Sequence, residues 1–269
     1  MTAVTTDAAP TLDAPVSFST VVFGLAGRSL NRIRRIPAAI IPTVAMPIFL
    51  LVAFSGSFSA VTDIPGFPTD NILNWVLAYA ILQGSAFSGA SASQAVAADL
   101  ESGFYDRLLM SPASRWSLLL APVTAALVRV MLPFLTVTAI AVLGGARFEG
   151  GIAGVITLLV AAEGFAIVAS LWGLGVVYRM RTQRSGAIVQ VGIFVVSFLS
   201  IGQVPLAVMQ GWLHGVARIN PLTNVLRMAR QGLIGDVTWA TTWPGLVVIA
   251  GGVLFFGAFA ATGLARIND

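Results

Sequence analysis

The 269-residue chain has no cysteine, no lysine and a single histidine, His214. The missing cysteines exclude disulfides and thiolate metal sites, and one histidine excludes a metal site built from several imidazoles. All fifteen basic residues are arginines, so the chain lacks the lysine of the phosphate-binding G-x-x-x-x-G-K-[ST] loop of ATPases. If the protein uses ATP, we expect another chain to bind the nucleotide and its magnesium ion.

Charge is also scarce. Charged residues make up 10% of the chain, 57% of the residues are hydrophobic, and the mean hydropathy is +0.90. An ordinary soluble domain is about one quarter charged, so the composition predicts an integral membrane protein. The arginines lie between apolar runs instead of in one aromatic-rich patch, which argues against nucleic-acid binding. High Arg, Ala and Gly without Lys suggests a GC-rich bacterial genome and the plasma membrane as location.

Six apolar runs are long enough to cross about 30 Å of hydrocarbon as helices. More arginines flank the side that holds both termini than the opposite side, so the positive-inside rule places both termini in the cytoplasm. We interpret residues 1–17 as a disordered cytoplasmic tail and residues 18–269 as one six-span membrane domain. The six runs are 36–54, 72–97, 117–143, 152–177, 186–205 and 244–265.

Two further segments flank these runs. The stretch before the first run places Phe18, Val22, Leu25 and Ile33 at helical spacing, which predicts an amphipathic helix in the inner interface or a topology anchor. The IGQVPL end of the fifth run and the stretch after it, to residue 242, are only moderately apolar and hold three outer arginines. A short re-entrant or interfacial helix before the last span would reconcile these features.

Two ionisable residues fall inside the runs, Arg129 in the third and Glu163 in the fourth. Each is expensive in hydrocarbon without a partner. Counted from the cytoplasmic ends of their spans, the two differ in depth by about 3 Å at 1.5 Å per residue, so we predict that they pair. The pair would either lock two helices together or belong to a translocation path or proton relay.

Small residues recur four apart in the second run. They permit close helix packing, with substrate contact as the alternative. An intramembrane hydrolase is disfavoured because the one possible histidine base, His214, falls in an outer loop. A six-span channel stays open as a less favoured class, although no acidic ring or carbonyl filter is evident. The two small-residue rows are Gly84, Ser88 and Ala92, and Ser85, Gly89 and Ser93.

The segment 99–116 concentrates charge between the second and third runs. A short apolar stripe runs through it at helical spacing, and Ser111 and Pro112 then stop the helix. Such a helix can lie on lipid or dock into a groove of a partner protein. The stripe consists of Leu100, Phe104, Tyr105, Leu108 and Leu109.

The spacing acidic-x-Gly-x-x-acidic followed by two apolar residues and Ser-Pro resembles the cytoplasmic coupling helix of type-2 ATP-binding-cassette exporter permeases. Phe104 stands where that family usually has threonine, and Asp106 where it usually has glutamate. A second stretch, Ile219 to Gly235, is similar to the Asn-Pro-Leu-Thr segment that the family carries before its last span.

This resemblance implies an all-α, six-span half-transporter with an N-terminal interfacial helix, a cytoplasmic coupling helix and a re-entrant outer segment. It implies a dimer with an identical or related permease, two separate ATPase subunits that hold ATP and magnesium, and no cofactor or metal on this chain. In the outer segment it implies roles for Asn220, Pro221, Arg227 and Arg230, the two arginines as interfacial anchors or gate residues. The implied coupling residues are Glu101, Gly103, Phe104, Tyr105, Asp106, Arg107, Leu108, Leu109 and Pro112.

The family exports diverse cargo. Few charges in the spans favour an apolar or amphiphilic compound, drug or lipid-like, that leaves the cytoplasm. A polysaccharide or glycolipid exporter of the same family is the alternative.

Overall fold

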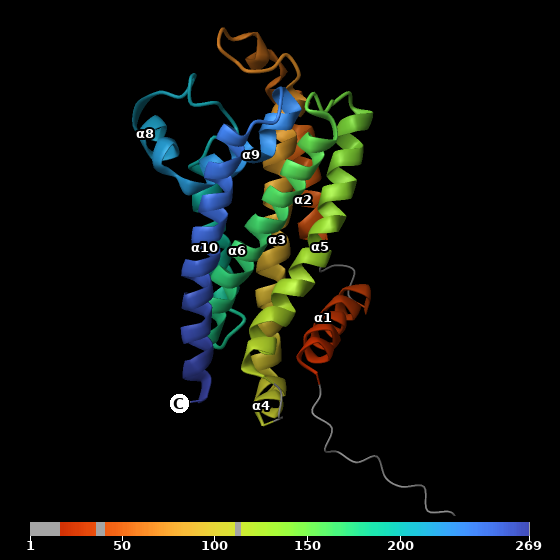
Figure 1. Ribbon diagram of the computed structural model, residues 1–269, viewed down its shortest axis with the longest axis vertical. Helices are drawn as coiled ribbons and strands as arrows, with labels where there is room; N and C mark the ends of the chain where they lie inside the picture. Colours follow the sequence, from red (N-terminus) through yellow and green to blue (C-terminus); the bar gives the residue numbers. More distant parts are fainter. Residues whose placement is uncertain (1–16, 36–40, 111–113, 269) are drawn as a thin grey trace, which may run out of the picture.

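The computed structural model describes residues 17–35, 41–110 and 114–268, and no strand occurs in these stretches. Long helices stand side by side along one axis, with α1 lying obliquely against α5 (Figure 1). Most of the predicted tail, residues 1–16, lies outside the described residues. The elements are α1 (Phe18–Arg35), α2 (Ile41–Ser57), η2 (Ser59–Asp63), α3 (Ile72–Glu101), α4 (Phe104–Leu109), α5 (Arg115–Leu143), α6 (Gly151–Met180), α7 (Ser185–Phe198), α8 (Gly211–Ile219), α9 (Pro221–Ile234), α10 (Trp239–Ala265) and η3 (Arg266–Asn268).

The described helices α5, α6 and α10 are long and apolar enough to cross a membrane. α7 is shorter: its 14 residues extend about 21 Å at 1.5 Å per residue. The predicted fifth run extended to residue 205, but the helix ends at Phe198 and turns follow it, so that boundary is wrong. The structure is therefore an all-helical bundle with apolar spans, while the count of six spans stays a prediction.

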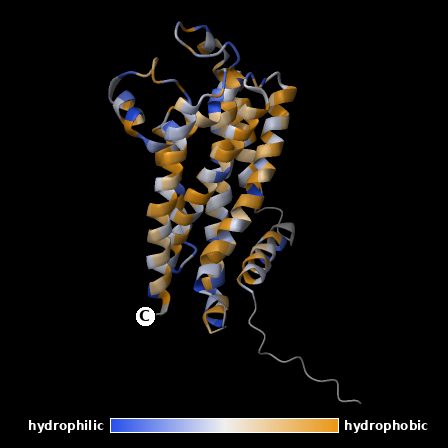
Figure 2. Ribbon diagram, in the orientation of Figure 1, coloured by the Kyte–Doolittle hydropathy of each residue, from blue (hydrophilic) through white to orange (hydrophobic). Residues whose placement is uncertain are grey.

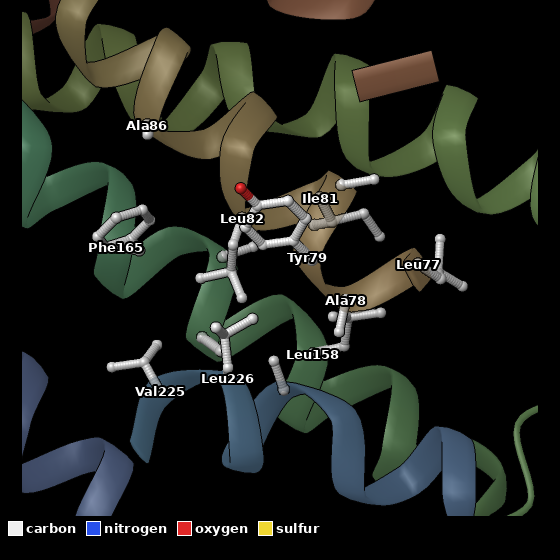
Figure 3. Close-up of a cluster of buried hydrophobic side chains, with 14 of the residues drawn as sticks. Leu77, Ala78, Tyr79, Ile81, Leu82, Ala86, Leu158, Phe165, Val225 and Leu226 are labelled. Carbon is white, nitrogen blue, oxygen red and sulfur yellow. The ribbon is translucent and has the colours of Figure 1, made fainter. Parts of the chain in front are cut away.

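α3 lies at the centre of the bundle and packs against α2, α5, α6, α7 and α9. Its side chains Leu77, Ala78 and Ile81 are fully buried, and Figure 3 shows Ala78 beside Leu158 of α6. The hydroxyls of Ser85 and Ser88 donate to carbonyls four residues earlier in the same helix. Because protein surrounds α3 and these serine hydroxyls bond within the helix, α3 tolerates more polar residues than a lipid-facing helix.

The small residues of α3 allow this central position. A Cβ on Gly89 would lie 2.7 Å from the Ala166 carbonyl oxygen of α6, and one on Gly84 would lie 2.7 Å from Cβ of Pro133 in α5. Both distances are shorter than real contacts, so the helices approach closely because these positions have no side chain. The packing interpretation of the small-residue rows is confirmed.

Polarity divides the molecule into a middle and two ends. Figure 2 shows hydrophobic residues along the middle of the long helices and hydrophilic ones gathered at the two ends. One end holds α4 and the C-terminal end of α10, and the opposite end holds η2 and α8 (Figure 1). The predicted functional segments thus fall at opposite ends, the charged hairpin at one and the outer segment at the other.

Candidate functional site

The hairpin between α3 and α5 begins with a tight turn at Gly103. The Gly103 N–H donates to the Leu100 carbonyl at 3.1 Å. Gly103 has φ +67°, in the left-handed region that a residue with a Cβ enters at a cost of about 1–2 kcal/mol. The glycine of the motif therefore lets the chain turn directly from α3 into the six-residue helix α4.

The apolar side of α4 faces the protein itself. Tyr105 is 3% exposed, and Leu108 and Leu109 are half-buried around the same cluster of side chains from α3, α5 and α6. We expected the apolar stripe to form a docking surface for a partner. Tyr105 is not part of such a surface, because its side chain points into the bundle.

The outward side of α4 is charged and ends in a large apolar side chain. Asp106 and Arg107 are exposed, and Met110, just after the helix, is 80% exposed. Trp116, at the start of α5, is exposed near the same end. Pro112 and its neighbours 111 and 113 lie outside the described residues. The surface available to a partner is therefore a small charged patch with apolar side chains beside it.

Glu101 links the end of α3 to the loop between α6 and α7. One carboxylate oxygen accepts from the backbone N–H of Gln183 at 2.7 Å, and the other accepts from the Gln183 side-chain amide at 2.5 Å. The backbone bond, then the side-chain bond and the nearby charge of Arg184, lower the pKa of Glu101. The ionised carboxylate thus joins the end of α3 to the α6–α7 loop.

Arg28 connects α1 to the hairpin. Its guanidinium makes a bidentate ion pair with Asp99 at 2.6 and 3.0 Å, and its Cζ lies 3.8 Å from the centroid of the Phe104 ring. A planar guanidinium suits both a carboxylate and an aromatic face. Phe104, in the place where the resemblance leads one to expect threonine, therefore supports Arg28 in this chain.

A third connection joins α4 to α5 and α6. The hydroxyls of Tyr105 and Tyr178 lie 3.2 Å apart, and they reach the Leu118 carbonyl oxygen at 3.3 and 3.1 Å. Pro122, four residues after Leu118, has no N–H, so this carbonyl lacks its usual helical donor. Burial raises the pKa of Tyr105 well above its ordinary value, so its hydroxyl remains a donor.

The predicted pairing of Arg129 with Glu163 is wrong. Arg129 donates to the Ser91 hydroxyl at 3.1 Å and to the carbonyl and hydroxyl of Ser29 at 3.1 and 2.7 Å. Oε2 of Glu163 has no hydrogen-bond partner among the described residues. Similar depth did not bring the two together, because Arg129 points from α5 toward α1 and α3 while Glu163 lies on α6.

At the opposite end, Asn220 starts α9 and fastens it to α7. Its Oδ1 accepts from the Leu222 N–H at 2.9 Å, and its amide donates to the carbonyls of Val196 and Leu199 at 2.8 and 2.9 Å. Pro221 occupies the first helical position, where a missing N–H costs nothing. The Asn-Pro pair is therefore a helix cap that also closes the end of α7.

Arg230 and Arg227 differ sharply although one turn of α9 separates them. Arg230 is 1% exposed, donates to the carbonyls of Trp75, Ile201 and Gly202 at 2.9 to 3.1 Å, and lies 3.5 Å from the Trp75 ring. Arg227 is exposed. The prediction of an interfacial anchor is wrong for Arg230, because its guanidinium is satisfied inside the protein.

The sequence did not predict the connecting role of three residues: Arg28, Tyr178 and Gln183. Pro122 offered one usable signal, because a proline inside a helix leaves a carbonyl that needs another donor. The position of Arg28 on an amphipathic helix gave a topology signal only. Nothing in the loop sequence around Gln183 indicates its contact with Glu101.

The sequence of this chain is also similar to known proteins. Residues 20–234 match the family model described as ABC-2 type transporter, which covers most of the chain. The daunorubicin resistance ABC transporter permease protein DrrB1 of Streptomyces coeruleorubidus is 25% identical over 232 residues, which span 85% of this chain and 80% of that protein. With its apolar helices, the chain is a multi-pass membrane permease, and it belongs to the ABC-2 type transporter family.

Proposed function

We propose that this chain is the permease subunit of an ATP-driven exporter, and that a separate ATPase docks against the outward side of α4. One observation carries the proposal: α4 is held on its inner side, while Asp106, Arg107 and Met110 remain exposed at the tip of the bundle. Absence of lysine supports the division of labour, since ATP and magnesium then belong to the partner.

The connections of the hairpin support a coupling role. A force on α4 reaches α1 through Arg28 and Phe104, and the α6–α7 loop through Glu101. Gly103 supplies the turn on which the hairpin depends. In this proposal Glu101 and Gly103 position the hairpin for coupling. Asp106 and Arg107 contact the ATPase.

The proposed cargo is an apolar or amphiphilic compound of the drug or lipid class. An apolar groove of about 650 Å³ lies between α6, α7, α9 and α10, with Trp172 and Phe256 among its lining residues. Such a lining favours apolar molecules over glycans, whose hydroxyls would lose hydrogen bonds to water. The name of the daunorubicin resistance relative supports a drug.

The complete transporter contains two permease copies, identical or related, and two ATPase subunits in a bacterial plasma membrane. The end that carries α4 faces the cytoplasm, together with both termini. α8 and α9 form the re-entrant outer segment, a proposal supported by the packing of α9 among α3, α6 and α10.

Two arginines allow a matched test of the docking surface. Arg107 is exposed at the α4 end, and Arg218 is exposed on α8 at the opposite end. In the transporter purified from native membranes with its ATPase, Arg107→Glu should lower ATPase recovery and ATP-driven efflux of an apolar dye at least several-fold, because it reverses charge at the interface. Arg218→Glu should leave both unchanged.

Equal loss in the two variants, or no loss in either, would contradict docking at α4. If no ATPase accompanies the wild-type chain and liposomes containing it conduct ions, the channel alternative is favoured instead. Mass spectrometry of the purified complex identifies the accompanying chains and gives their stoichiometry.

A further inference from the structure

We propose that Tyr105, Tyr178 and the Leu118 carbonyl form a joint that transmits movement of α4 to α5 and α6. This inference rests on the proposed function and names positioning residues for it. Neither tyrosine touches the ATPase or the cargo in this arrangement, since Tyr105 is 3% and Tyr178 0% exposed. Their role is to make the small helix α4 move together with two long spans.

The joint exists because Pro122 interrupts the hydrogen bonding of α5. In a regular helix the Leu118 carbonyl would accept from the N–H of residue 122, but proline has none. A buried carbonyl without a donor costs free energy, so another donor must approach it. Here both donors are tyrosine hydroxyls, one from α4 and one from α6.

The three groups act as a unit because their contacts outnumber their protons. Three close contacts connect the two hydroxyls and the carbonyl, but only two hydroxyl protons are available. Either both hydroxyls donate to Leu118, or one donates to the other hydroxyl, which in turn donates to Leu118. Loss of one hydroxyl therefore alters the bonding of the other, as in cooperative networks.

The position of the joint gives it mechanical importance. α4 has six residues and packs chiefly against α3, so its attachment to α5 and α6 depends on side chains. The Tyr105 side chain enters a cluster with Leu174 and Val177 of α6 and Leu118 of α5. The hydroxyl bonds add direction to this apolar contact, because they fix where the ring ends lie.

The chain offers a matched control, since it contains three tyrosines. Tyr79 is also buried, at 1% exposure, and its oxygen accepts from Gln203 at 3.2 Å in the half of the bundle away from α4. Tyr→Phe removes one oxygen at each position and keeps the ring. The three variants therefore differ in the place of the lost hydroxyl and hardly in packing.

The test reconstitutes each variant with the co-purified ATPase in liposomes and measures dye exported per ATP hydrolysed. Tyr105→Phe and Tyr178→Phe should retain ATPase binding and ATP hydrolysis but lower this ratio about threefold or more, within the range of a lost buried hydrogen bond. Tyr79→Phe should keep the wild-type ratio. A merely structural role would lower protein yield or both rates together, leaving the ratio unchanged.

Pro122→Ala provides an independent arm. The new N–H of residue 122 can bond the Leu118 carbonyl and compete with the hydroxyls. The single variant Pro122→Ala should therefore lower the amount of dye exported per ATP hydrolysed. Adding Tyr178→Phe to it should lower the ratio little further, since coupled groups are non-additive.

Fully additive effects of Pro122→Ala and Tyr178→Phe would contradict the joint and leave the proposed function standing. The same holds if the wild type exports dye and both tyrosine variants export as much dye per ATP as the wild type. Absence of ATP-driven export by the wild-type complex would overturn the proposed function and the joint with it.

Discussion

The two ends of the bundle each hold an arginine over an aromatic ring, in contrasting surroundings. At the α4 end, the side chain of Arg28 is 48% exposed, pairs with the Asp99 carboxylate and lies over Phe104. At the opposite end, Arg230 is 1% exposed, bonds three backbone carbonyls and lies over Trp75. The first arginine joins side chains near the surface, and the second joins backbone segments inside the protein.

The two sets of contacts differ in the free energy needed to break them. Carbonyl contacts from Arg230 fix the ends of neighbouring segments, and a buried donor set of this kind is costly to break. An exposed ion pair contributes little to stability and can part and reform at small cost. The Arg28–Asp99 contact is therefore the adjustable one, as the proposed coupling role requires, and the Arg230 contacts fix the opposite end.

The largest expected effect comes from the fixed end. Arg230→Met keeps much of the volume but leaves three carbonyls without this donor, which should destabilise the protein by about 3–5 kcal/mol. The loss is measured as a lower midpoint of thermal unfolding in detergent. The comparison of the two ends predicts a much smaller shift for Arg28→Met.

Arg227→Met is the control for this prediction. Arg227 lies one turn earlier on the same helix and is exposed, so its replacement should change stability by less than about 0.5 kcal/mol. Similar shifts for Arg227→Met and Arg230→Met would show that the buried contacts of Arg230 carry no special weight.

Much of the fold was readable from the sequence because hydrophobic runs and helices share the same physical cause. The long apolar helices α5, α6 and α10 coincide with predicted runs. The end of α7 was predicted wrongly, because residues 199–205 are apolar enough for a span although the chain turns there. Hydropathy reports burial and does not report where the backbone changes direction.

The candidate site was predicted in part. Spacing located the α4 hairpin and its glycine turn, since both depend on local sequence. The pairing of Arg129 with Glu163 failed because depth along a helix says nothing about direction around it. Arg28, Tyr178 and Gln183 were missed because their contacts join segments distant in sequence, and one sequence does not reveal such neighbours.

A smaller effect is expected from the adjustable end. A double-mutant cycle of Arg28→Ala and Asp99→Asn should give a coupling energy of about 0.5–1 kcal/mol, since the arginine is half exposed. The coupling should shrink in high salt, because ions screen exposed charges. Thermal unfolding of the four proteins at two salt concentrations measures both. A coupling as large as the loss in Arg230→Met would remove the distinction between the ends.

The smallest expected effect is a pH dependence at Glu101. Its two hydrogen bonds from Gln183 lower its pKa below the usual glutamate value of 4.5, so the link is complete above pH 4.5 and weakens as pH falls through the lowered pKa. Hydrogen exchange of the backbone N–H of Gln183 is compared between the wild type and Glu101→Ala. The wild type should show extra protection near neutral pH, and this protection should disappear in acid. Protection that persists below the lowered pKa would mean that the carboxylate does not hold the α6–α7 loop, and the α4 end would then lose one of its three connections to the bundle.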